Sequence, residues 1–467
     1  MLFNSYSFVL FLPAAFGLFW LMPKRVGVQN ALIVLLSGYF YACWDVRVLG
    51  LLVGSVVWTQ AWMSILSRPK AKSRVTLLLA IVPLIGILGV FKYYNFFVDS
   101  LLGRFAFAAN LHLDLILPVG VSFYTFMCVS YLVDAYQGKF KAGLADHLNL
   151  STTASLMFFP QLAAGPIGRV AAMVPQFREA RHFDYAQAVE GCRQMLWGYF
   201  KKVLVADTCS IVVAELLRSG QKSSVGIWVG VIVYTIQIYA DFSGYSDLAI
   251  GCGKLFGIRL MRNFSYPYFA TNVGEFWRRW HMTLTRWLTD YIYIPLGGNR
   301  CSKGRRIFNT MVTFLTSGLW HGAAWNFVAW GGVHGVFFIP RILKKKTVRC
   351  TPTPKIYTFF SWFLTMFVVA LGWVLFRAPD IATAGHWYKM LFCPCCLDLH
   401  GAGLTTCGLG KALLFSVIMF GWEWVSRENE LVRLPQARLF RWIIYLSGVL
   451  LFFGYFPQAE NFIYFQF

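Results

Sequence analysis

The stretch TFLTSGLWHGAAWNF, residues 313–327, places one histidine, His321, among small residues and tryptophans in a strongly apolar chain. Glycines flank this histidine at Gly318 and Gly322, and such small residues let another backbone or a ligand approach closely. An ionisable side chain within a membrane segment is a functional candidate. Imidazole also suits general acid–base catalysis, because its ordinary pKa is near 6.5. The alternative is a core histidine that is hydrogen-bonded to a carbonyl.

The composition indicates an integral membrane protein. Of 467 residues, 58% are hydrophobic and only 13% are charged, and the mean hydropathy is +0.57. A soluble domain has about 25% charged residues, so this much apolar surface does not fit a soluble core. The net charge of +22 is spread over short loops, which is typical of cytoplasmic loops and argues against a nucleic-acid partner.

Apolar segments recur along the whole chain and predict an all-α polytopic fold. A membrane span needs about 20 residues, so we expect about 10–12 transmembrane or half-spanning helices in a single domain, residues 1–467. The predicted segments are 6–22, 30–44, 46–66, 75–98, 115–136, 150–165, 186–217, 225–252, 307–340, 356–377, 410–425 and 439–456.

Basic loops predict the orientation of the segment that contains His321. The loops 68–74, 299–306 and 341–349 are rich in Lys and Arg and are expected to be cytoplasmic. If the last two loops face the same side, residues 307–340 enter the membrane and return as two short helices or a re-entrant pair. The turn then lies near residues 317–325, and His321 lies deep inside the protein.

A second histidine, His281, lies in the polar segment 272–298. Apolar residues there follow helical spacing, while Arg278 is too polar for lipid. We predict a half-buried helix facing a cavity, and an interfacial anchor is the alternative. Pro295 and the glycines that follow it are expected to end this helix.

Carboxylates and a third histidine, His334, interrupt other apolar runs. Asp241, Ser243 and Asp247 lie within residues 238–251, and buried carboxylates are costly unless they are paired. They could pair with arginines of the segment 262–279 or line a polar passage, and Asp134 raises the same choice. His334 has glycine neighbours, so it could either pack against another helix or contribute to a site.

Other motifs point away from soluble-enzyme chemistry. The chain has no G-x-S-x-G elbow, Walker loop, Rossmann glycine pattern or H-E-x-x-H. The cysteine cluster at Cys393, Cys395 and Cys396, with His400, fits no standard zinc spacing. We therefore expect no metal site. The remaining histidines are expected at the surface: His112, His147, His182 and His386.

Several stretches together resemble the membrane-bound O-acyltransferase family, in particular its bacterial branch for alginate O-acetylation. The matching stretches follow the family order along the whole chain: LPVGVSFYTF (117–126), FPQLAAGPIGR (159–169), GYFKKVLVAD (198–207), YADFSGYSDLAIG (239–251), NFSYPYFATNVGEFWRRWHMTLTRWLTDYIYIPLGGNR (263–300), TFLTSGLWHGAAWNFVAWGGVHG (313–335), LGWVLFRA (371–378) and NFIYFQF (461–467).

The resemblance implies a ring of helices around a central funnel or tunnel that reaches the histidine. It makes His321 the essential histidine and His281 the second one. The implied donor is acetyl-CoA, with no tightly bound cofactor, and the acceptor is an extracytoplasmic polysaccharide such as alginate. The expected partner is a periplasmic or membrane-anchored SGNH-type (Ser-His-Asp) acetyltransferase, and the expected location is the bacterial inner membrane, in contact with membrane lipid. Candidate tunnel residues are Asp241, Ser243, Asp247, Arg278, Trp280, Trp320, Asn326 and His334.

Two other functions stay open from the sequence. One is D-alanyl transfer from a carrier protein to teichoic acid, which a more distant member of the same branch performs. The other is a transporter or non-catalytic acyl conduit. In the favoured reaction, His321 is either the general base or the residue that carries the acyl group.

Overall fold

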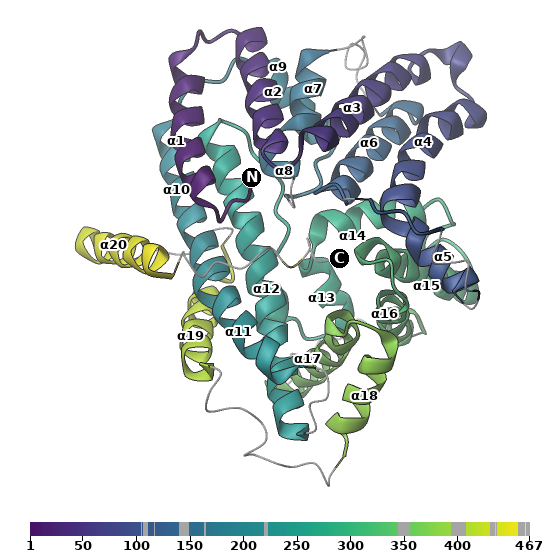
Figure 1. Ribbon diagram of the computed structural model, residues 1–467, viewed down its shortest axis with the longest axis vertical. Helices are drawn as coiled ribbons and strands as arrows, with labels where there is room; N and C mark the ends of the chain where they lie inside the picture. The colour runs from purple at the N-terminus through teal and green to yellow at the C-terminus, as the bar shows by residue number, and fades with distance from the viewer. Residues whose placement is uncertain are drawn as a thin grey trace. The chain divides into compact units, whose positions relative to one another are not determined.

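The structure is a computed structural model that describes residues 1–103, 105, 111–115, 117–139, 149–162, 165–218, 223–343, 355–393, 408–429, 435, 437–455 and 463. Every regular element among these residues is helical (Figure 1). The chain divides into two compact units: unit 1 comprises Met1–Met195 and Leu248–Met261, and unit 2 comprises Leu196–Asp247 and Arg262–Phe467.

Unit 1 is built from the first half of the chain. Its helices α2, α3, α4, α6 and α7 pack against one another, with α3 and α4 both against α6. Side chains cap several helices, as where Ser73 accepts the amide of Thr76 at the start of α4. The elements are α1 (Tyr6–Leu21), α2 (Val26–Ala42), α3 (Val46–Leu66), η1 (Pro69–Ala71), α4 (Arg74–Leu88), η2 (Gly89–Tyr93), α5 (Tyr94–Leu102), α6 (Val121–Tyr136), α7 (Leu150–Met157), α8 (Phe159–Leu162), α9 (Val170–Arg178) and most of α10 (Tyr185–Tyr199).

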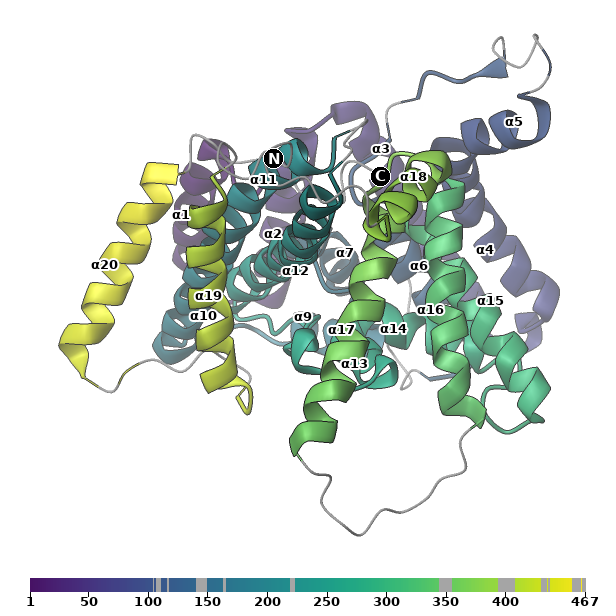
Figure 2. The same cartoon turned by 90° about the horizontal axis from the view of Figure 1, so that it is seen from below.

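Unit 2 contains most of the predicted site. The helices α15 and α16 form an antiparallel hairpin that packs against α17 (Figure 2), and the exposed helix α20 lies at the edge of the unit. The elements are η4 (Phe200–Ala206), α11 (Asp207–Leu216), most of α12 (Ser224–Leu255), η5 (Pro267–Phe269), α13 (Val273–Arg279), α14 (Met282–Leu288), η6 (Thr289–Tyr293), α15 (Lys303–His321), α16 (Trp325–Leu343), α17 (Lys355–Arg377), α18 (Ile381–Leu391), α19 (Leu409–Ser426) and α20 (Arg438–Tyr455).

Within the described part of the chain, six helical stretches are long and apolar enough to cross a membrane, which confirms the polytopic membrane class. They are Val46–Leu66, Arg74–Leu102, Ser224–Leu255, Lys355–Arg377, Leu409–Ser426 and Arg438–Tyr455, and two shorter apolar helices are Tyr6–Leu21 and Val26–Ala42. The segment 46–66 was predicted with its observed bounds. The segment 150–165 was predicted as one run, but it contains two short helices, α7 and α8. The ring around a central funnel stays a prediction.

Amide side chains and aromatic rings surround a buried arginine, Arg181, in unit 1. The backbone amide of Arg181 donates to Gln29 Oε1 at 2.9 Å, and its guanidinium donates to Asn30 Oδ1 at 2.8 Å. The guanidinium also lies 5.5 Å from the ring centres of Phe19 and Phe177. These contacts tie α2 to the segment before α10, and cation–π contacts replace part of the lost hydration. This is a structural role.

Candidate active site

The hairpin α15–α16 places His321 at a buried turn. His321 is the last residue of α15, and α16 begins at Trp325, so the predicted turn near residues 317–325 is confirmed. The imidazole is only 3% exposed. The two helices therefore bring the histidine into the interior of unit 2, as the basic loops predicted.

Glycines allow this hairpin to close. A Cβ on Gly318 would meet the carbonyl of Phe327, and a Cβ on Gly331 would meet the carbonyl of Phe314. The ring of Phe327 occupies the space that a side chain at Gly322 would need. The small residues near His321 thus admit the backbone and a side chain of the hairpin. Of the two possibilities raised by the sequence, a close backbone approach is confirmed at Gly318, and room for a ligand stays a prediction.

His281 lies at a break between two short helices. The sequence predicted one helix through residue 281, but α13 ends at Arg279 and α14 begins at Met282. His281 has φ 39° and ψ 55°, a left-handed conformation that costs a non-glycine residue about 1–2 kcal/mol. The prediction of one continuous helix was therefore wrong. The helical end at Pro295 is confirmed, because η6 ends at Tyr293.

Hydrogen bonds on both sides hold this break. The amide of Ser265 donates to the carbonyl of Arg279 at 2.9 Å, and the amide of Met282 donates to the carbonyl of Asn263 at 2.8 Å. The hydroxyl of Thr283 also donates to Asn263 Oδ1 at 2.6 Å. The segment that begins at Asn263 therefore aligns with the chain around His281 and over-determines its strained backbone.

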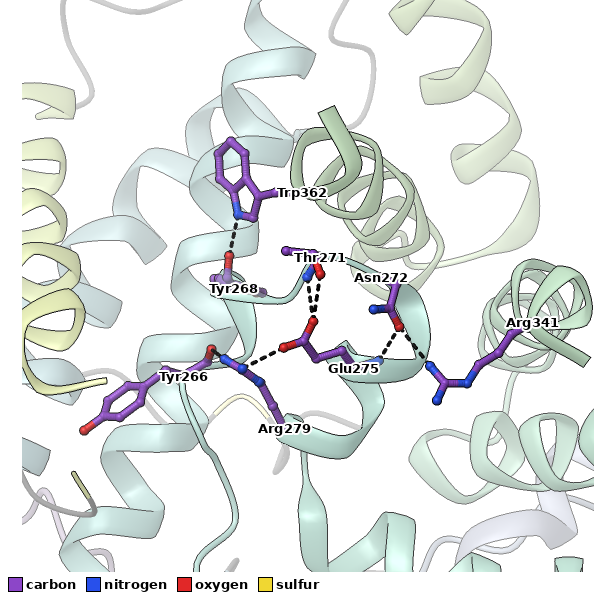
Figure 3. Close-up of polar contacts among 8 residues, drawn as sticks. All are labelled: Tyr266, Tyr268, Thr271, Asn272, Glu275, Arg279, Arg341 and Trp362. Carbon is purple, nitrogen blue, oxygen red and sulfur yellow. Dashed lines mark hydrogen bonds and ion pairs between the residues drawn. The ribbon is translucent and has the colours of Figure 1, made fainter. Parts of the chain in front are cut away.

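A polar frame fixes the other end of α13 (Figure 3). Asn272 caps the helix by accepting the amide of Glu275 at 2.9 Å, and it also accepts Arg341 Nη1 of α16 at 2.9 Å. Glu275 pairs with Arg279 at 2.6 Å. The guanidinium of Arg341 lies where a Cβ of Gly274 would be. Arg341 therefore joins the end of α16 to the helix that leads to His281.

The two histidines meet in an aromatic environment. Their ring centres are 6.3 Å apart, and Trp320 lies 5.9 Å from His281 and 4.9 Å from His321. Phe242 contacts His281 at 4.6 Å, and Trp330 contacts His321 at 5.0 Å. We call these two imidazoles and their surrounding rings the histidine centre. Because aromatic rings surround it, this centre is shielded from bulk water, a setting in which electrostatic effects on a reaction are stronger than in water.

His334 borders the histidine centre through Trp330. Its ring lies 5.0 Å from Trp330 and 5.0 Å from Trp277, and it is fully buried. A Cβ on Gly372 would lie 2.7 Å from its Nε2, so α17 approaches this imidazole closely. The structure thus gives His334 a packing role, which is one of the two roles that the sequence left open. The Trp330 ring contacts both His334 and His321.

Other predicted tunnel residues have different surroundings. Trp280 is buried and stacks on Tyr268, with ring centres 5.9 Å apart. Asn326 donates to the carbonyls of Leu375 and Ala378 at 3.2 and 2.7 Å, which satisfies the end of α17. Arg278 is exposed. In these contacts, Trp280 and Asn326 stabilise the scaffold around the centre.

The predicted carboxylates pair with lysines that the sequence analysis did not identify as partners. Lys202 Nζ lies 2.9 Å from Asp241 Oδ1 and 2.7 Å from Asp207 Oδ1, and Lys201 Nζ lies 2.5 Å from Asp247 Oδ2. We call these five residues the lysine–carboxylate cluster. The sequence suggested arginines of the segment 262–279 as partners of Asp241 and Asp247, but in these pairs the partner is a lysine. Ser243 is buried on the same helix, α12.

A π-helix explains how two consecutive lysines reach α12. Both lysines lie in η4, a π-helix of residues 200–206, and such turns are frequent at functional sites. Gly244 lets α12 approach closely, because a Cβ there would lie 2.9 Å from the amide nitrogen of Lys202. The stretch GYFKKVLVAD contains both lysines. Two consecutive lysines are also typical of an exposed loop, so the stretch alone does not predict that they pair with α12.

The carboxylate of Asp134, in unit 1, is also paired. It lies 3.1 Å from Lys139 Nζ.

The expectation of no metal site stays a prediction. Among the described residues, no group of three His, Cys, Asp or Glu side chains is arranged to hold a metal ion. Cys393 is described and partly exposed, whereas Cys395, Cys396, His400 and His147 lie outside the described residues. His182 is exposed, as predicted.

Comparison with known proteins identifies the class of this histidine-containing membrane protein. A model of the MBOAT, membrane-bound O-acyltransferase family matches residues 137–378. The chain is 37% identical over 451 residues to the probable alginate O-acetylase AlgI of Pseudomonas aeruginosa, covering 94% of this chain and 84% of that protein. It is 37% identical over 445 residues to the peptidoglycan O-acetyltransferase of Helicobacter pylori, covering 88% and 82%.

A more distant relative is the teichoic acid D-alanyltransferase of Bacillus subtilis, which is 26% identical over 278 residues, covering 56% of this chain and 69% of that protein. Together these matches define a membrane acyltransferase. The chain belongs to the membrane-bound O-acyltransferase family. It is a multi-pass protein of the bacterial inner membrane, which confirms the family and location predicted from the sequence.

Proposed function

We propose that this protein takes an acetyl group from a cytoplasmic thioester, acetyl-CoA, and passes it across the membrane for O-acetylation of an extracytoplasmic polysaccharide. The observation that carries the proposal is the buried histidine pair, with ring centres 6.3 Å apart, in a chain of this family. The names of the two relatives at 37% identity support an O-acetyl group and a glycan acceptor such as alginate or peptidoglycan.

In the proposed reaction, His321 acts as a general base on the attacking hydroxyl. The hydroxyl oxygen forms a bond to the acetyl carbon, the carbon–sulfur bond breaks, and the thiolate takes the proton from the imidazolium. In the other version, an imidazole nitrogen of His321 attacks the acetyl carbon, the carbon–sulfur bond breaks and the thiolate leaves. The hydroxyl oxygen then attacks the acetyl-imidazole, the carbon–nitrogen bond breaks, and the hydroxyl proton passes to the thiolate. His281 orients the donor or shares the proton. An SGNH-type partner outside the membrane completes transfer to the glycan.

Replacing His321 tests the proposal. His321→Ala should lower polysaccharide acetylation by about 10²–10⁴-fold, while the amount of protein in the membrane stays normal. His182→Ala, at an exposed histidine, is the matched control and should acetylate normally. Full acetylation by His321→Ala, measured as acetyl content of the purified polysaccharide, would exclude His321 from the reaction.

The donor needs a separate experiment. Purified protein in lipid nanodiscs, supplied with radiolabelled acetyl-CoA, should release free CoA at a rate that depends on His321. Binding of acetyl-CoA without any release of CoA would favour a passive conduit. Labelled D-alanyl carrier protein, supplied as the donor in the same assay, tests the alternative of D-alanyl transfer. That alternative is supported by more distant relatives such as the 26% identical D-alanyltransferase.

A further inference from the structure

The chain beyond α20 contacts the interior of unit 2 at one described residue. The backbone amide of Ile463 donates to Asp241 Oδ2 at 2.7 Å. Ile463 is 5% exposed and Asp241 is 2% exposed. Asp241 lies near the middle of the long apolar helix α12. A backbone amide that is removed from water needs a partner, and this carboxylate supplies one.

The carboxylate of Asp241 has a different partner on each oxygen. Oδ1 faces the ammonium of Lys202 at 2.9 Å, and Oδ2 accepts the Ile463 amide. Lys202 supplies a cationic partner for this carboxylate, and a hydrogen bond to a charged acceptor is stronger than one between neutral groups. Asp207 shares Lys202, whereas the acceptor of the Ile463 amide is Asp241. Within the lysine–carboxylate cluster, Asp241 Oδ2 is therefore the acceptor for the backbone amide of Ile463.

This acceptor belongs to the turn of α12 that also contacts the histidine centre. The residue that follows Asp241, Phe242, contacts the His281 ring with centres 4.6 Å apart. Consecutive Cα atoms are about 3.8 Å apart. One turn of α12 therefore contacts both His281 and the chain at Ile463.

We propose that Asp241 is a positioning residue, which holds the chain at Ile463 beside the histidine centre, and that this docking is required for acyl transfer. The inference rests on the proposed function because it assigns the docking to that reaction. Lys202 assists by pairing with the other carboxylate oxygen, and the amide supplies a contact that any residue other than proline can make.

Substitutions on both sides of the hydrogen bond test whether the docking is needed. Ile463→Pro removes the amide hydrogen, and Asp241→Asn removes the charge, so each should lower acetylation by on the order of 10- to 100-fold. The double variant should acetylate no worse than Asp241→Asn alone, because Asp241→Asn already disturbs the acceptor of the Ile463 amide. Ile463→Val keeps the amide and should acetylate at least about tenfold better than Ile463→Pro. Unchanged acetylation by Ile463→Pro would overturn the requirement.

A labelling experiment measures the docking of the chain at residue 463 independently of acyl transfer. The thiol introduced by Ile463→Cys should resist a membrane-permeant maleimide when Asp241 is present, and should react when Asp241→Asn is added. Asp207→Asn is the matched control, because it changes the same cluster without touching the amide. Mass spectrometry of the peptide that contains residue 463 separates this thiol from the native cysteines.

The outcomes of the two experiments are distinct. Equal labelling with and without Asp241→Asn would overturn the docking itself. Full acetylation by His321→Ala would overturn the proposed function, while an Asp241-dependent change in labelling would still support the docking.

Discussion

The histidine centre and the lysine–carboxylate cluster are both buried in unit 2, yet they have opposite compositions. His281 and His321 are surrounded by aromatic rings, whereas the two lysines are surrounded by carboxylates. An imidazole can be neutral without a counter-ion, but a buried ammonium or carboxylate needs an opposite charge. The surroundings of the first region therefore suit neutral imidazoles, whereas those of the second region compensate charges.

The largest expected effect on stability comes from breaking the cluster. Lys202→Met leaves Asp207 and Asp241 without their shared cation and should destabilise the protein by about 3–5 kcal/mol. His321→Ala should lose transfer with a much smaller change in thermal stability. Tryptophan-fluorescence melting of the purified proteins in detergent measures both.

A triple variant tests whether uncompensated charge causes the loss of stability in Lys202→Met. Adding Asp207→Asn and Asp241→Asn to Lys202→Met removes all three charges and should recover part of the lost stability. If the triple variant melts no higher than Lys202→Met alone, uncompensated charge is not the cause.

A smaller effect is expected where α17 meets His334. Gly372→Ala places a methyl group 2.7 Å from His334 Nε2, and such overpacking typically costs about 1–3 kcal/mol. Gly385→Ala in α18 is the control, because a Cβ there meets nothing within 4 Å. Equal melting temperatures for the two variants would show that the imidazole moves aside without cost.

The smallest effect concerns the backbone of His281. Both His281→Gly and His281→Ala remove the imidazole, but only glycine adopts φ 39° without strain. His281→Gly should therefore be more stable than His281→Ala by about 1 kcal/mol, measured by the same melting assay. A more stable alanine variant would mean that the break straightens when the imidazole is lost.

Much of the fold could be predicted from the sequence because apolar run length is a local property. The bounds of α3 and α17 followed from their runs, and the basic loops predicted the buried turn at His321. The partners of Asp241 and Asp247 could not be predicted in this way, because such pairing depends on contacts between distant segments. The left-handed conformation of His281 has no local signal either, since helical spacing continues across it.

The π-helical turn η4 has a consequence for reading the sequence around it. A π-helical turn holds about one residue more than an α-helical turn, and one residue of an α-helix rotates the chain by about 100°. The outward faces of α10 and α11 are therefore out of phase across residues 200–206. An insertion or deletion of one residue there changes the direction in which side chains point, as well as the length of the chain.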